Sequence, residues 1–120
     1  MQNSKKINNR ISGVKHWWHQ KITAILLMPL TMWFLFSLPD FMTLSYEEKL
    51  SWINYDYNLI LISLFFIISS YHMKIGLTVV IEDYIHNQNL KKIFSILVTV
   101  LILLIILLTL IINTYKFLGV

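Results

Sequence analysis

The sequence predicts an all-α membrane protein with three transmembrane helices. Hydrophobic residues make up 57% of the 120-residue chain, whereas a soluble domain has roughly 45–50%. Roughly 20 apolar residues, within a range of about 17–25, span the hydrocarbon core of a bilayer, and the spanning backbone must bond internally. The three long apolar runs lack the alternation of membrane strands, which leaves helices. The runs are Ile22–Leu38, Tyr57–Ile81 and Ile93–Ile112.

We expect residues 1–15 to form a flexible polar tail in the cytoplasm. Residues 16–120 are expected to form a single domain, a three-helix transmembrane anchor. The helices are predicted at about 17–38, 57–84 and 91–116. Pro29 predicts a kink in the first of them. In the loop that follows, Ser45 with Glu48 three residues later is a capping-box pattern, which predicts a short interfacial helix.

The distribution of lysine and arginine predicts the orientation, because cytoplasmic loops carry the excess of these residues. Seven of them lie before the first apolar run or in the second loop, while the first loop and the C-terminus carry one each. The N-terminus and the second loop are therefore expected in the cytoplasm, with a mitochondrial matrix as the second choice. The seven are Lys5, Lys6, Arg10, Lys15, Lys21, Lys91 and Lys92.

The second apolar run carries a group of polar residues. At about 100° and 1.5 Å per residue, His72, Gly76 and Asp83 share one helix face, with Asp83 roughly 16 Å from His72 along the axis. A membrane-buried histidine can bind haem iron, and a glycine one turn away lets a flat macrocycle approach the backbone. The alternative is that His72 hydrogen-bonds a neighbouring helix and Gly76 permits close helix packing.

Other polar groups also allow two interpretations. Lys74 points about 200° from His72. A charge inside the membrane is often functional, but a snorkelling lysine or one paired with a partner subunit is the favoured interpretation. Tyr84 beside Asp83 fits a helix end in water, but its hydroxyl at the membrane edge can also donate to a quinone carbonyl. His16 and Lys21 can meet anionic lipid or haem propionates.

These features together resemble the small hydrophobic membrane anchors of succinate dehydrogenase, complex II, in their α-proteobacterial and mitochondrial forms. The shared elements are "HWWHQKITAILLMPLTMW" at the first helix, the pattern H-x₃-G-x₆-D-Y from His72 to Tyr84, and three helices in about 120 residues. The resemblance covers the chain from about Gly13 to its end.

The resemblance implies that this chain forms half of a haem-binding bundle with a second anchor subunit of the cytochrome b556 type, and that each of the two gives one histidine to a b-type haem. It implies His72 as the iron ligand, Tyr84 with Asp83 at a ubiquinone site, and His16 with Lys21 near the haem propionates. Lys21 stands where arginine is usual, so a bidentate contact becomes a point-charge contact. Lys74 has no counterpart in the pattern.

The implied role is that of one part of an enzyme of electron transport and the tricarboxylic acid cycle in the inner membrane of a bacterial cell. A flavoprotein oxidises succinate, an iron–sulfur subunit passes electrons to the membrane, and this chain itself has no succinate-oxidising site. Two alternatives remain open. One is a fumarate reductase anchor, and the other is a small transporter or structural membrane subunit without cofactor.

Overall fold

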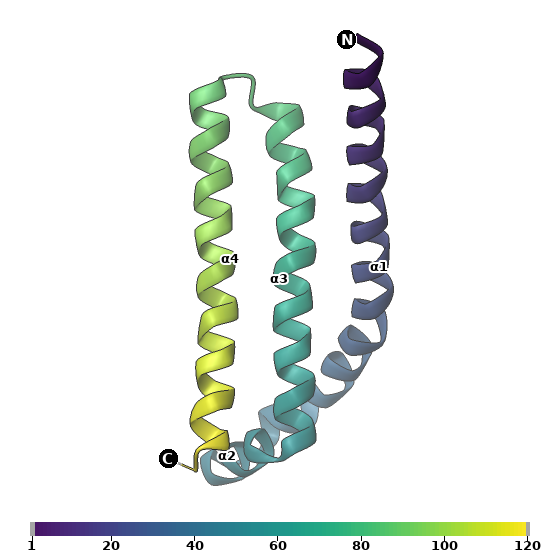
Figure 1. Ribbon diagram of the computed structural model, residues 1–120. Helices are drawn as coiled ribbons and strands as arrows, with labels where there is room; N and C mark the ends of the chain where they lie inside the picture. The colour runs from purple at the N-terminus through teal and green to yellow at the C-terminus, as the bar shows by residue number, and fades with distance from the viewer. Residues whose placement is uncertain (1, 120) are drawn as a thin grey trace.

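The computed structural model describes the backbone of residues 2–119 and the side chains of residues 13–119. The described chain forms four helices: α1 (Gln2–Thr43), α2 (Tyr46–Asn54), α3 (Asp56–Tyr84) and α4 (Gln88–Phe117). Helix α3 lies between α1 and α4 and packs against both, running antiparallel to each (Figure 1). Three segments are long and apolar enough to cross a membrane: Gly13–Thr43, Asp56–Tyr84 and Gln88–Phe117. The predicted all-α membrane fold is confirmed.

Helix α1 is longer than expected at both ends. It begins at Gln2, so the segment expected as a polar tail is helical in its backbone, and it ends at Thr43 rather than near Leu38. Residues 2–12 contain no proline or glycine to stop a helix. Proline has no backbone N–H, so it removes one hydrogen bond to the carbonyl four residues earlier, while the residues after it can still form theirs. The helix accordingly continues through both Pro29 and Pro39. Its lower half bends, as Pro29 predicts (Figure 1).

The short helix α2 follows the predicted capping box. The Ser45 side chain accepts a hydrogen bond from the Glu48 backbone N–H, and the Glu48 carboxylate accepts from the Ser45 backbone N–H at 2.8 Å. The Ser45 hydroxyl also donates to this carboxylate at 2.8 Å. The backbone and hydroxyl bonds that the carboxylate accepts from Ser45 stabilise its charged form and lower the pKa of the Glu48 carboxyl from its ordinary 4.5. Trp52 of α2 then stacks on Trp33 of α1, with ring centroids 6.1 Å apart, which holds α2 beneath the bundle.

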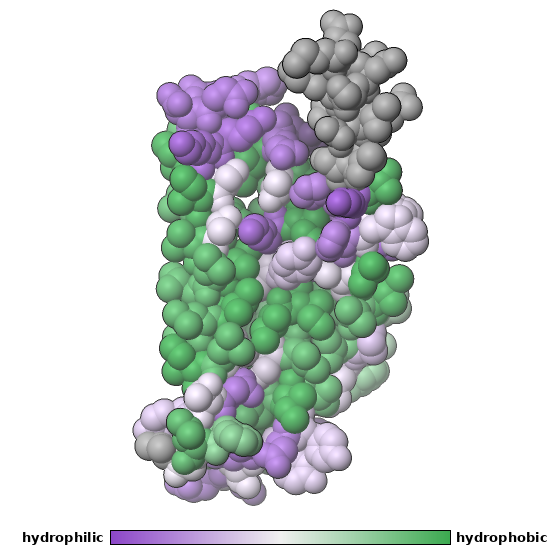
Figure 2. All heavy atoms as spheres, in the orientation of Figure 1, coloured by the Kyte–Doolittle hydropathy of each residue, from purple (hydrophilic) through white to green (hydrophobic). Residues whose placement is uncertain are grey.

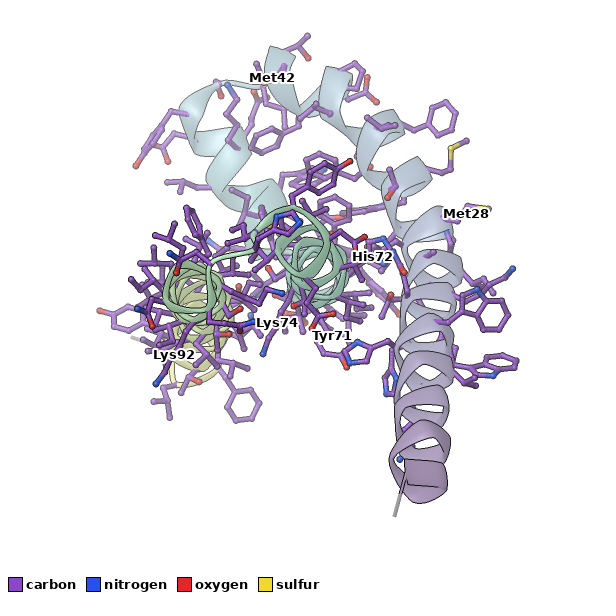
Figure 3. All side chains as sticks on the ribbon, turned by 90° about the horizontal axis from the view of Figure 1, so that it is seen from above. Met28, Met42, Tyr71, His72, Lys74 and Lys92 are labelled. Carbon is purple, nitrogen blue, oxygen red and sulfur yellow. The ribbon has the colours of Figure 1, made fainter. Side chains whose placement is uncertain are left out.

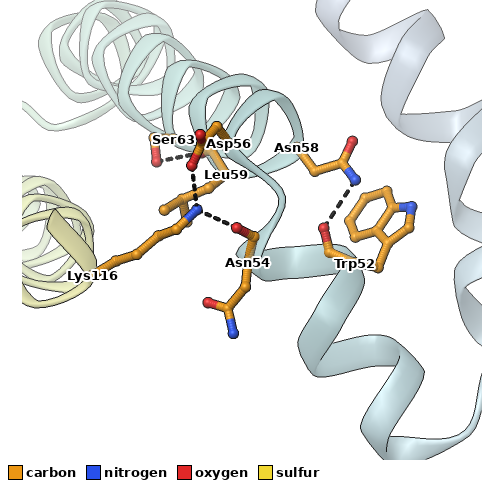
Figure 4. Close-up of polar contacts among 7 residues, drawn as sticks. All are labelled: Trp52, Asn54, Asp56, Asn58, Leu59, Ser63 and Lys116. Atoms are coloured by element: carbon orange, nitrogen blue, oxygen red, sulfur yellow. Dashed lines mark hydrogen bonds and ion pairs between the residues drawn. The ribbon is translucent and has the colours of Figure 1, made fainter. Parts of the chain in front are cut away.

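The end of the bundle that carries α2 is tied together by polar contacts (Figure 4). Lys116, near the end of α4, forms an ion pair with Asp56 at the start of α3 at 2.8 Å and also donates to the carbonyl of Asn54. Asn58 donates to the Trp52 carbonyl at 2.9 Å. These contacts fix the ends of α2, α3 and α4 relative to one another.

Little of the apolar surface is buried within the chain. Only four apolar side chains among those described, Leu59, Ile75, Ile81 and Ile102, are buried, while most leucine and isoleucine side chains of α4 are about half exposed. On the face drawn in Figure 2, apolar residues fill the middle of the molecule and polar residues gather at its two ends. Such a surface needs lipid or a partner protein around it.

Candidate haem and quinone site

The candidate site lies along the seam between α1 and α3, in the half of the bundle that holds the α3–α4 connection (Figure 1). Because the two helices are antiparallel, residues that follow one another down α1 meet residues in reverse order on α3. His16 and Val79 line one cavity, and two helical turns further into the bundle Thr23 meets His72. The seam therefore orders the polar residues by depth.

His72 is held by a residue that the sequence analysis did not single out. Its Nδ1 lies 2.7 Å from the hydroxyl oxygen of Thr23 on α1. Thr23 is buried, with 7% of its surface exposed, and His72 is half-buried. Figure 3 shows His72 on the side of α3 that faces α1. Within the side chains described, from residue 13 to residue 119, the other ring nitrogen, Nε2, makes no hydrogen bond.

The two interpretations of Gly76 differ in what lies against it. A Cβ added there would meet nothing within 4 Å, so no other helix of the described chain packs closely against it. Gly76 is therefore not a close-packing point between described helices of this chain, and its packing against a helix of a second chain stays a prediction. The hydrogen bond that the alternative for His72 places to a neighbouring helix is present, between Nδ1 and Thr23 of α1.

Lys74 leaves α3 on a different side from His72 (Figure 3). Its side chain is half-buried and lines a cavity of about 300 Å³ together with basic residues of α1. It forms no ion pair with any acidic group among the described side chains. Lys74 thus belongs to a cationic hollow between α1 and α3, and not to the His72 face. The residues lining that hollow are Lys15, His16, His19, Tyr71, Lys74, Ile75 and Thr78.

The two expected propionate contacts lie on different parts of α1. His16 lines both the cationic hollow and a second cavity of about 460 Å³ that also includes Val79 of α3. Lys21 instead lies over the ring of Trp17, with its Nζ 5.1 Å from the ring centroid. At about 100° per residue, Lys21 is roughly 160° around α1 from Thr23. The structure brings His16 to the seam with α3 but directs Lys21 away from it.

Asp83 and Tyr84 form the last turn of α3. Both are exposed, and the Tyr84 side chain has 78% of its surface free. Lys91 of α4 donates to the Glu82 carbonyl at 3.1 Å and so stabilises this helix end with a cation. The structure does not bring Tyr84 to His72, from which twelve residues of helix, roughly 18 Å, separate it. Haem and quinone residues would form two sites at different depths.

No group of three or more potential metal ligands comes together in the part of the chain that is described. A metal ion held by side chains of this chain alone is therefore not indicated. A single histidine such as His72 can still serve a metal whose other ligands come from a macrocycle and a second protein chain.

Comparison with known proteins identifies the family of the chain. The family model described as "Succinate dehydrogenase/Fumarate reductase transmembrane subunit" matches residues 2–109. The chain belongs to this family. A succinate dehydrogenase membrane anchor subunit from Reclinomonas americana is 30% identical over 75% of this chain and 78% of its own length. A succinate dehydrogenase hydrophobic membrane anchor subunit from Rickettsia bellii is 35% identical over 81% of this chain and 83% of its own.

The resemblance inferred from the His72–Tyr84 pattern and the first helix is thereby confirmed at the level of the family. No solved structure matches the chain. Membership of a family of transmembrane subunits, together with three helices of spanning length, establishes a multi-pass membrane protein. It also disfavours the transporter alternative.

Proposed function

We propose that this chain is the hydrophobic membrane anchor of a succinate:ubiquinone oxidoreductase in a bacterial inner membrane, with its N-terminus in the cytoplasm. Its partners are a second anchor subunit of the cytochrome b556 type, an iron–sulfur subunit and a flavoprotein. The relatives above are named as succinate dehydrogenase anchors, which supports the direction of succinate oxidation. The fumarate reductase anchor remains the second candidate, since the family description includes both enzymes.

The observation that carries the haem assignment is the bonding of the His72 ring. One ring nitrogen is occupied by Thr23 at 2.7 Å, and the other has no partner within residues 13–119. One turn away, a Cβ on Gly76 would meet nothing within 4 Å in the described part of the chain. A donor nitrogen beside an uncovered stretch of backbone fits the edge of a haem at membrane depth. The haem, when bound, supplies a one-electron redox centre within the membrane.

In this proposal each residue of the chain has a separate task. His72 would hold the haem iron from this chain, together with a histidine of the second anchor subunit. His16 lies two turns nearer the water on the same side of α1 as Thr23 and would reach the haem propionates. Lys21 lies on another side of α1, over Trp17, so its contact with the propionates stays a prediction. Tyr84 donates its hydroxyl hydrogen to a ubiquinone carbonyl, while Asp83 beside it accepts and passes protons at the membrane edge.

The test is His72→Ala in the purified complex, with His86→Ala as the matched control, because His86 is exposed in the α3–α4 connection. The proposal expects His72→Ala to lose haem b or its low-spin spectrum, while His86→Ala keeps both. Succinate oxidation with an artificial acceptor reports whether the complex has assembled. An unchanged low-spin haem spectrum in His72→Ala would refute the assignment.

A further inference from the structure

The contacts of the Thr23 hydroxyl determine where the ring hydrogen of His72 lies. The Thr23 oxygen is 2.8 Å from the carbonyl oxygen of His19, 3.1 Å from that of Gln20, and 2.7 Å from Nδ1 of His72. A hydroxyl has a single hydrogen to donate and two lone pairs that accept. Carbonyl oxygens accept only, so the hydroxyl hydrogen points to the α1 backbone and the remaining contact is made by a lone pair.

The other assignment of hydrogens is unfavourable. If the hydroxyl donated to Nδ1, the Thr23 oxygen would face the His19 carbonyl oxygen at 2.8 Å with no hydrogen between them. Thr23 is buried, so water does not relieve that repulsion. The imidazole must therefore donate from Nδ1, and a neutral imidazole that carries its hydrogen on Nδ1 has its lone pair on Nε2.

From this arrangement we infer that Thr23 is a positioning residue, which fixes the tautomer and the ring orientation of His72 so that the lone pair of Nε2 is presented to the metal. The inference rests on the proposed function, in which His72 is a haem ligand. The contacts run from the α1 backbone through the Thr23 hydroxyl to the imidazole. They therefore also set the depth of the ligand relative to α1.

Two measurable consequences follow from this contact. A hydrogen bond from Nδ1–H makes the imidazole a stronger electron donor, which favours oxidised iron and lowers the haem midpoint potential. Loss of the bond should therefore raise the potential. Removing such a partner of a metal-bound histidine typically weakens metal binding about 10- to 100-fold, so haem transfer from the complex to excess apomyoglobin should accelerate by about that factor.

The experiment compares Thr23→Val and Thr23→Ser in the whole purified complex. Valine keeps the branched shape and removes the hydroxyl, whereas serine keeps the hydroxyl. The control is Thr99→Val on α4, because Thr99 is half-buried and likewise bonds its own helix backbone, at 2.8 Å to the Ser95 carbonyl, but does not bond a histidine. Midpoint potential, low-spin spectrum and haem transfer rate are measured for each.

The inference expects a raised potential and faster haem transfer in Thr23→Val, with Thr23→Ser and Thr99→Val close to the wild type. If Thr23→Val matches the wild type while His72→Ala loses its haem, the inference fails and the proposed function stands. If His72→Ala keeps its haem, both fail. Equal changes in Thr23→Val and Thr99→Val would also overturn the inference. Should Thr23→Val not assemble, Thr23→Ser and Thr23→Ala differ only by the hydroxyl oxygen and decide the question.

Discussion

Replacing Tyr84 by phenylalanine isolates one hydroxyl group at the end of α3. The Tyr84 side chain is 78% exposed and its hydroxyl bonds no group within residues 13–119. Within the described side chains, Tyr84→Phe therefore removes no hydrogen bond of the fold. Any effect of Tyr84→Phe must come from what covers Tyr84 in the complex, which in the proposed function is ubiquinone.

The expected magnitude comes from a single hydrogen bond. A neutral bond contributes about 0.5–1.5 kcal/mol net, and leaving its buried partner unpaired costs about 1–3 kcal/mol. If the whole effect falls on the rate-limiting step, quinone-dependent turnover should drop roughly 2- to 150-fold. Electron transfer from succinate to an artificial acceptor at the flavin should stay unchanged, because that route does not pass through the membrane site.

The control is Tyr57→Phe, which changes a tyrosine of similar exposure, 70%, at the opposite end of α3. It should leave both activities unchanged. A proportional fall of both activities in Tyr84→Phe would mean that Tyr84 stabilises the assembled complex. No change in either activity would mean that Tyr84 is a solvated interfacial tyrosine, and the quinone assignment would be refuted.

Two further predictions concern topology and packing. The wild type has no cysteine, so a thiol reagent should label only a cysteine introduced at an exposed position such as Glu47 or Gln88. Glu47→Cys should be labelled from outside intact cells, and Gln88→Cys only after permeabilisation. The reverse pattern would invert the predicted orientation. Asn113 donates to Ser63 at 2.7 Å between α4 and α3, and Ser63 keeps its own bond to the Leu59 carbonyl. Asn113→Leu should therefore lower the free energy of unfolding in mixed micelles by only about 0.6 kcal/mol, and a loss well above about 1.7 kcal/mol would contradict this reasoning.

The parts of the fold that depend on local sequence could be predicted from it. The capping box at Ser45 lies within four residues, and the structure contains it with the helix that it predicts. The full extent of α1 could not be read from hydrophobicity, because hydrophobicity marks what lies in lipid while the helical backbone continues into water. Helix α1 accordingly runs through Pro39 to Thr43.

The candidate site was predictable only in part, because spacing within one helix does not show how two helices pack. Helical spacing places His72 and Gly76 on one face of α3, but it says nothing of which helix faces them. The contact with Thr23 joins residues 49 positions apart and needs the packing of α1 on α3. One signal was available, since Thr23 follows His16 by seven residues and so shares its face of α1. Lys21, by contrast, contacts Trp17 of its own helix α1. Its role at the haem propionates stays a prediction.

The central claim is that this chain anchors a succinate-oxidising complex and binds a haem. Its most direct test is purification of the tagged chain from its native membrane, followed by identification of the co-purifying proteins and a reduced-minus-oxidised absorption spectrum. The account predicts a flavoprotein, an iron–sulfur subunit and a second anchor subunit, together with a b-type haem band that the His72→Ala variant lacks. A chain that purifies without a flavoprotein, or a complex whose haem band is unaffected by His72→Ala, would contradict it.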